Sequence, residues 1–167
     1  MRKIRILFLS ILFGFMINSC IWTRPDEQII PEPVQFSAVI IDRTTFENSV
    51  VTKPIQNIVK SGKIYIKDNI MFLNDVNKGF HVYDYTNPAN PIKTGFINIL
   101  GATDLAIRNN NLYINQATDL VTLSYNSTDN SIVILNRDKN VFPQKKSPQG
   151  FISPTTASQI IIDWIKI

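Results

Sequence analysis

The chain has 167 residues, a formal net charge of +4 and a hydrophobic fraction of 44%. This length fits one ordinary domain plus a targeting segment, and the hydrophobic fraction excludes a disordered chain. Three of the 17 basic residues are Arg2, Lys3 and Arg5, and without them 14 basic residues face 13 acidic ones. The remainder is close to neutral, which argues against nucleic acid as a partner.

The supply of cysteine and histidine limits the chemistry further. Cys20 is the only cysteine and His81 the only histidine. An intramolecular disulfide and a metal cluster of several Cys and His ligands are therefore excluded. We expect no metal and no cofactor.

Residues 1–19 have the three parts of a secretory signal: a cationic start, an apolar run and small or polar residues before Cys20. The run from Ile6 to Ile17 is shorter than the ~20 residues of a spanning helix, and it suits a signal peptide. An ordinary signal peptide, or an N-terminal membrane anchor that happens to contain a cysteine, is the alternative.

The end of this segment, Ile17-Asn18-Ser19-Cys20, resembles a bacterial lipobox. The resemblance implies that Cys20 is the lipidated first residue of the mature protein. Acyl chains such as palmitate bind a bilayer with ~0.8 kcal/mol per buried CH₂ group. We therefore expect a lipid-anchored protein of the bacterial cell envelope, on the periplasmic face or the cell surface of the outer membrane.

The segment after Cys20 is a predicted tether over residues 20–35, because it holds Pro25, Pro31 and Pro33 and shows no apolar periodicity. A β-repeat domain is predicted over 36–167. It opens with a strand over 36–41, followed by a short helical turn that Asp42 or Thr44 caps.

A unit of about forty residues is written twice, over 62–101 and 102–142. An ungapped shift of 41 positions pairs Ile64 with Leu105, Met71 with Leu112, Phe80 with Val121 and Val82 with Leu123. Each copy contains four predicted strands, near 63–67, 70–74, 79–85 and 92–99 in the first and near 104–108, 111–115, 119–125 and 131–137 in the second. Asn, Asp and Gly occupy the intervening turns, at 68–69, 77–79, 87–91, 109–110 and 126–130.

Such a period in a strand-rich chain is typical of β-propeller blades. The predicted fold is all-β: a partial β-propeller of about two four-stranded blades with degenerate flanking strands. Closed propellers need about four blades or more, so the chain is an open partial propeller, an assembling subunit or a truncated relative of longer proteins. The last predicted strand, 159–166, pairs back onto the N-terminal part in one interpretation.

The two units are similar to LVIVD repeats, and the resemblance covers roughly residues 36–143. These repeats occur in uncharacterised Gram-negative lipoproteins thought to form β-propellers. The resemblance implies a propeller fold and a membrane address, and it carries no catalytic residues to transfer.

Two groups of side chains suggest chemistry. His81, Tyr83 and Tyr85 share one strand face, which is typical of either a ligand-binding stripe or a packing face; we favour packing. Five aspartates (Asp68, Asp75, Asp84, Asp104 and Asp119) are predicted at turns. None has the spacing of a calcium loop, so we favour turn chemistry over metal binding.

With one histidine and no glycine-framed serine, a nucleophile activated by a base is not supported. The sequence therefore predicts a non-enzymatic interaction or scaffold protein, with the membrane and either a homo-oligomer or another protein as partners. One alternative is an envelope ligand-binding protein or enzyme whose pocket forms only on oligomerisation. The other is a fragment of a longer propeller lipoprotein.

Overall fold

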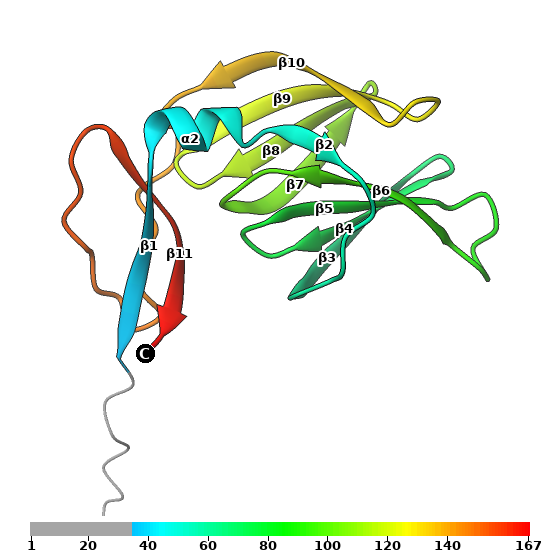
Figure 1. The fold of residues 1–167 in the computed structure, drawn as a ribbon. Coiled ribbons are helices and arrows are strands. Elements are labelled where there is room, and N and C mark those ends of the chain that lie inside the picture. Colours follow the sequence, from blue (N-terminus) through cyan, green and yellow to red (C-terminus); the bar gives the residue numbers. More distant parts are fainter. Residues whose placement is uncertain (1–34) are drawn as a thin grey trace, which may run out of the picture. The chain divides into compact units, whose positions relative to one another are not determined.

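The computed structural model describes residues 35–167, so the predicted signal peptide, Cys20 and nearly all of the tether lie outside the described residues. The described part is all-β, as predicted, with antiparallel sheets and one short helix (Figure 1). Its elements in chain order are β1 (Phe36–Asp42), α2 (Arg43–Asn48), β2 (Val51–Lys53), β3 (Ser61–Lys67), β4 (Ile70–Asp75), β5 (Gly79–Asp84), β6 (Ile92–Asn98), β7 (Ala102–Arg108), β8 (Asn111–Gln116), β9 (Asp119–Asn126), β10 (Ser131–Asp138) and β11 (Gln159–Lys166).

Each predicted repeat forms one antiparallel meander. The first meander is β3 to β6, and the short strand β2 extends it beyond β6. The second meander is β7 to β10. All eight strands lie within two residues of their predicted positions. None of the sheets in the described part closes on itself.

The turns explain why the strands end where they do. Asp68, Asn77, Asn109, Asn110 and Asn130 all have positive φ values, between 48° and 65°. Asn and Asp tolerate this left-handed conformation at a small cost, and tight hairpins require it. The predicted turn residues are therefore confirmed at these positions.

The ungapped alignment of the two copies is wrong by one residue in the third strand. Phe80 pairs with Asn74 across the β4–β5 hairpin, whereas Leu120 pairs with Asn115 across the β8–β9 hairpin. The structural counterpart of Phe80 is therefore Leu120, not Val121, because the second hairpin turn is one residue shorter. The shift of 41 returns in the fourth strand, where both copies have a bulge at equivalent positions, Thr94 and Leu135.

The backbone links between elements also recur at the same spacing. The Val76 N–H donates to the Lys60 carbonyl at 2.9 Å, and the Ala117 N–H donates to the Gly101 carbonyl at 3.0 Å. Likewise the Gly101 N–H donates to Asn77 at 2.8 Å, and the Phe142 N–H donates to Thr118 at 2.9 Å. Equivalent backbone hydrogen bonds therefore hold the segments that enter and leave each meander.

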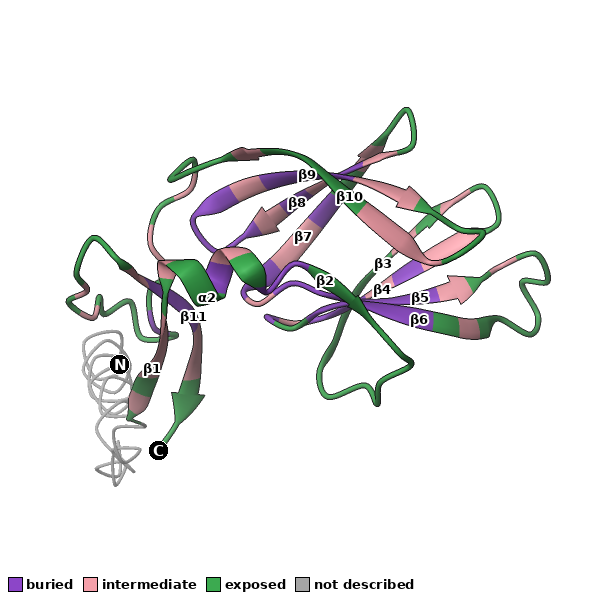
Figure 2. Ribbon diagram, turned by 45° about the horizontal axis from the view of Figure 1, so that its top comes forward, coloured by how far each residue is buried: buried purple, intermediate pink, exposed green. Residues whose placement is uncertain are grey.

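The main core lies between the two meanders (Figure 2). One face of the first meander contributes Phe72, Phe80, Val82 and Ile97, and the second contributes Leu105, Leu112, Ile114, Val121 and Leu123. Full burial of such a side chain stabilises the fold by about 1.5–3 kcal/mol. The apolar run in β4 is covered unequally, since Phe72 is buried while Ile70, Met71 and Leu73 are half-buried.

A smaller core joins the two ends of the domain. β1 pairs with β11 in a two-stranded antiparallel sheet, which confirms that the C-terminal strand pairs back onto the N-terminal part. Ile160 and Ile162 from β11 pack with Phe46 of α2 and Ala117. Asp42 occupies the N-cap position of α2 without a capping side-chain hydrogen bond. β1 therefore belongs to a separate two-stranded sheet rather than to a four-stranded unit.

Within residues 35–167, no helix has the length and apolar character needed to cross a membrane.

Candidate functional site

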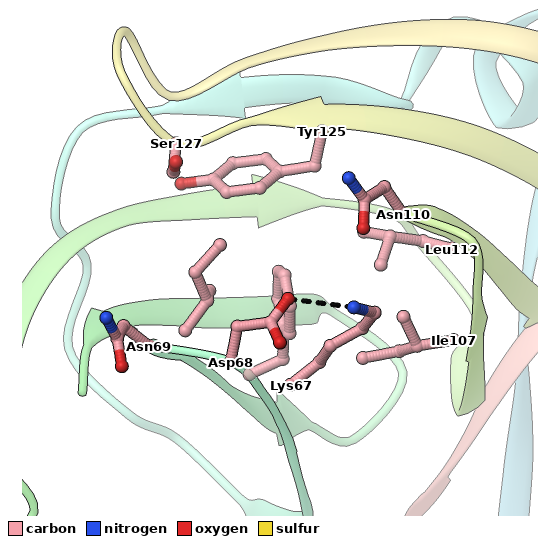
Figure 3. Close-up of a pocket in the computed structure, with 10 residues that line it drawn as sticks. Lys67, Asp68, Asn69, Ile107, Asn110, Leu112, Tyr125 and Ser127 are labelled. Carbon is pink, nitrogen blue, oxygen red and sulfur yellow. Dashed lines mark hydrogen bonds and ion pairs between the residues drawn. The ribbon is translucent and has the colours of Figure 1, made fainter. Parts of the chain in front are cut away.

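The β3–β4 hairpin and the β7–β8 hairpin stand beside each other and form a groove, the hairpin groove (Figure 3). Its volume is about 310 Å³. The two hairpins occupy equivalent places in their meanders, because Asp68 and Asn109 are 41 residues apart in equivalent turns. Their left-handed conformations make the turns tight and place polar residues at the rim of the groove.

The floor of the hairpin groove is apolar. It consists of Ile70 and Phe72 from β4, Ile107 from β7 and Leu112 from β8, with the ring of Tyr125 from β9. The rings of Phe72 and Tyr125 meet edge to face, with centroids 5.5 Å apart and planes inclined at 80°. Such pairs contribute about 0.5–1.5 kcal/mol beyond their buried area, so this contact helps to hold Tyr125 in place at the floor.

The rim of the groove is polar. Lys67 and Asp68 form an ion pair with an Nζ–Oδ2 distance of 2.8 Å. Tyr125 and Ser127 lie across the hollow from Asp68, and the Asn110 amide lies at the same opening (Figure 3). A second hollow of about 270 Å³ shares Ile70 and Tyr125 with the first and continues toward β5.

The Tyr125 hydroxyl donates to Asn130 Oδ1 at 2.5 Å. Burial raises the pKa of this phenol above its usual value of 10.0, so the hydroxyl stays protonated at neutral pH. The hairpin groove therefore presents an apolar floor with neutral amide and hydroxyl groups and one compensated ion pair. This combination suits the binding of an apolar side chain flanked by hydrogen-bonding groups.

His81 lies elsewhere, in the opposite face of the first meander. It is fully buried, its ring centroid is 4.8 Å from that of Phe96, and its Nε2 is 3.2 Å from Asp75 Oδ2. His81 is thus buried by contacts within the first meander, and not at the contact between the two meanders where a blade-to-blade packing face would place it. Tyr85 follows the end of β5 and is not part of the strand.

The surroundings of His81 set the charge of both partners. Burial lowers the pKa of His81 below 6.5, so the ring is neutral at pH 7, and Nδ1 has no hydrogen-bond partner. Burial alone would raise the pKa of Asp75, but N–H groups of Val59, Lys60 and His81 lower it below its usual value. By accepting from the Val59 and Lys60 N–H groups, the Asp75 carboxylate anchors the segment before β3 to the end of β4.

The prediction that five aspartates occupy turns holds only in part. Asp68 lies in a turn, and Asp84 accepts a hydrogen bond from the Thr86 N–H at 2.8 Å just after β5. Asp104 lies inside β7 and pairs with Lys63 at 2.6 Å. Among residues 35–167, no three His, Cys, Asp or Glu side chains are grouped closely enough to hold a metal ion.

Asp119 is the clearest residue whose role the sequence did not reveal. Its side chain has no exposed surface, and its Oδ2 pairs with Arg43 at 2.6 Å and Arg137 at 3.0 Å. Each of the two guanidinium groups also makes a cation–π contact with Phe46, with its central carbon 5.5 Å from the centre of the ring. Arg43 is 76 positions away in sequence, so no local spacing could have indicated the pair.

The structure does not describe Cys20, so its lipidation stays a prediction. No family model, curated protein or solved structure matches the chain. The resemblance to LVIVD repeats therefore also stays a prediction.

Proposed function

We propose that this chain is a lipid-anchored protein of the bacterial cell envelope whose β-repeat domain has a non-enzymatic interaction or scaffold role. The observation that carries the proposal is the placement of Cys20 directly after an apolar signal-like run, in the sequence Ile17-Asn18-Ser19-Cys20. Lipidation would account for a single thiol at this place and would hold the domain at a bilayer surface.

The proposal includes the propeller interpretation, with the two meanders as two blades of an open LVIVD-like propeller. Three features support it: the face-to-face core, the equivalent bulges at Thr94 and Leu135, and the recurring backbone links into and out of each meander. Blade-like repeats are built to be stacked on neighbours in this manner.

We place the contact with a partner at the hairpin groove. Its apolar floor can take an apolar side chain, and Asn69, Asn110 and Ser127 at its rim can exchange hydrogen bonds with the groups beside that side chain. An extended segment of another envelope protein has this chemistry. The specificity of the domain would then lie in the shape of the floor around Phe72 and Tyr125.

The lipid anchor is tested by metabolic labelling of the full chain with an alkyne-bearing palmitate analogue in a Gram-negative host. We expect label on the wild-type protein and its recovery with membranes, and loss of both in the Cys20→Ser variant. Label that persists without Cys20, or a wild-type chain without label, would show that the anchor is wrong.

The interaction role is tested by photo-crosslinking in cells from a benzoylphenylalanine placed at Ser127, on the rim of the groove. We expect a discrete protein adduct that disappears when Ile70→Trp fills the floor. The matched control carries the photo-reactive residue at Ala89, which is exposed in the β5–β6 turn outside the groove. Equal adducts from Ser127 and Ala89 would remove the groove from the proposal.

A further inference from the structure

The two meanders have equivalent apolar faces, but only the face of the second meander is buried against a neighbouring sheet. In the second meander, Leu105 pairs with Ile114 and Ile107 pairs with Leu112, and this face packs against the first meander. In the first meander, Ile64 pairs with Leu73 and Ile66 pairs with Met71 at the same repeat positions. We call this second set, Ile64, Ile66, Met71 and Leu73, the open face.

Exposure separates the counterparts clearly. Leu105 is 5% exposed, whereas its counterpart Ile64 is 58% exposed and Ile66 is 51% exposed. Residues 54–60 contact the same sheet near Phe96, Asp75 and Lys93. The open face therefore presents apolar side chains of the kind that the second meander buries.

The opposite surface is also present in the chain. The face of the first meander that covers Leu105 includes Tyr65, Phe72 and Phe80, and the counterparts of these residues in the second meander are Ala106, Tyr113 and Leu120. They line a hollow of about 430 Å³ together with Phe142. We call Ala106, Tyr113, Leu120 and Phe142 the far face.

We propose that a second copy of this chain docks head to tail, with the open face of one copy against the far face of the next. The internal contact between the meanders is the template, since the same repeat positions would meet across the two chains. This contact rests on the repeat geometry and uses neither Cys20 nor the hairpin groove, so it goes beyond the proposed function and stands or falls independently of it.

Charge at the edge of the contact agrees with the template. Within the chain, Lys63 pairs with Asp104, which stands 41 positions later. Across two chains the same geometry brings Asp104 of one copy to Lys63 of the next, again with opposite charges. The two side chains are 66% and 49% exposed, so each has room for a second partner.

A head-to-tail contact uses two different surfaces and therefore closes into a ring or extends into a filament. Two copies would supply four blades, which is about the number that a closed propeller needs. The contact would also cover the exposed branched side chains of Ile64 and Ile66 in β3.

The test uses full-length chains with two different tags, co-expressed and crosslinked in their native membranes with a short bismaleimide. One chain carries Lys63→Cys and the other Asp104→Cys, so that only an interchain adduct can form between these positions. A chain with neither substitution measures the background from Cys20. We expect an adduct between the two tags in the mixture and none from Lys63→Cys alone.

Each other outcome contradicts the proposal. An adduct of Lys63→Cys with itself, equal to that of the mixture, would show a two-fold contact instead of a head-to-tail one. No adduct in the mixture would show that the faces do not meet.

A second pair of variants separates docking from folding. Ile64→Asp with Ile66→Asp should reduce the mixed adduct at least tenfold. Phe151→Asp with Ile152→Asp, which changes two exposed apolar residues of the loop before β11, should leave it unchanged. Thermal melts of the purified variants check that both remain folded. An adduct that survives the change in β3 would overturn the proposal.

Discussion

Asp119 offers the sharpest test of how the described domain is held together. Its carboxylate is buried and accepts from four groups: Arg43 at 2.6 Å, Arg137 at 3.0 Å, and the Asn140 N–H and the Thr118 hydroxyl at 3.1 Å each. These partners come from α2, β10 and two loops. The variant Asp119→Asn keeps the size of the side chain and removes its charge.

The expected cost follows from the burial of the partners. Removing one member of a fully buried ion pair costs about 3–5 kcal/mol. The two arginines are 18% and 11% exposed, so water compensates part of the loss. We therefore expect Asp119→Asn to lower the free energy of unfolding by about 2–3 kcal/mol, and to lower Tm by about 8 °C.

The dependence on pH provides an independent check. Burial alone would raise the pKa of Asp119, but hydrogen bonds from Arg43, Asn140 and Arg137 lower it below 3.8. A carboxyl whose pKa is lower in the folded state stabilises the fold above 3.8 and loses this effect as pH falls through the folded-state pKa. The difference between wild type and Asp119→Asn should therefore shrink as pH falls below 3.8.

The assay is urea unfolding of the purified protein, followed by circular dichroism at pH 7 and at several pH values below 4. The control is Asp138→Asn, which removes an exposed carboxylate from the same sheet and should change stability by less than 0.5 kcal/mol. If Asp119→Asn is as stable as this control, the buried network does not hold α2 to the second meander.

Three further predictions use other parts of the domain. Burial lowers the pKa of His81, so wild-type stability should fall as pH drops from 6.5, and His81→Leu should fall less in urea melts over this range. Gly79→Ala would bring its Cβ to 2.0 Å from a backbone oxygen of the neighbouring strand and should cost about 3 kcal/mol, whereas Gly150→Ala, with no atom within 4 Å, should cost about 1 kcal/mol in the same assay. Burial and a hydrogen bond to Asp104 raise the pKa of Tyr65 to about 12, so absorbance titration should show one tyrosine near 12 that titrates at lower pH in Asp104→Asn. A His81→Leu curve parallel to wild type, equal costs for the two glycines, or an unchanged titration of Tyr65 would each contradict the corresponding argument.

The sequence alone determined the features that depend on local pattern. Strand positions followed from alternating apolar residues, and hairpin turns followed from Asn, Asp and Gly, because these residues tolerate left-handed backbone. The period of 41 indicated two equivalent meanders, since equivalent residues at equivalent spacing adopt the same local structure. The final strand, 159–166, was predicted at its observed bounds.

Only the tertiary structure decided the features that depend on distant contacts. The deletion of one residue in the β8–β9 turn changed which residue of β9 faces the core, because a shift by one residue reverses every side chain of a strand. The tertiary fold also pairs Asp119 with Arg43 and places His81 next to Asp75. It brings the two hairpins that form the groove together as well. Leu105 and Ile64 have the same local pattern, and packing alone made one of them buried and the other exposed.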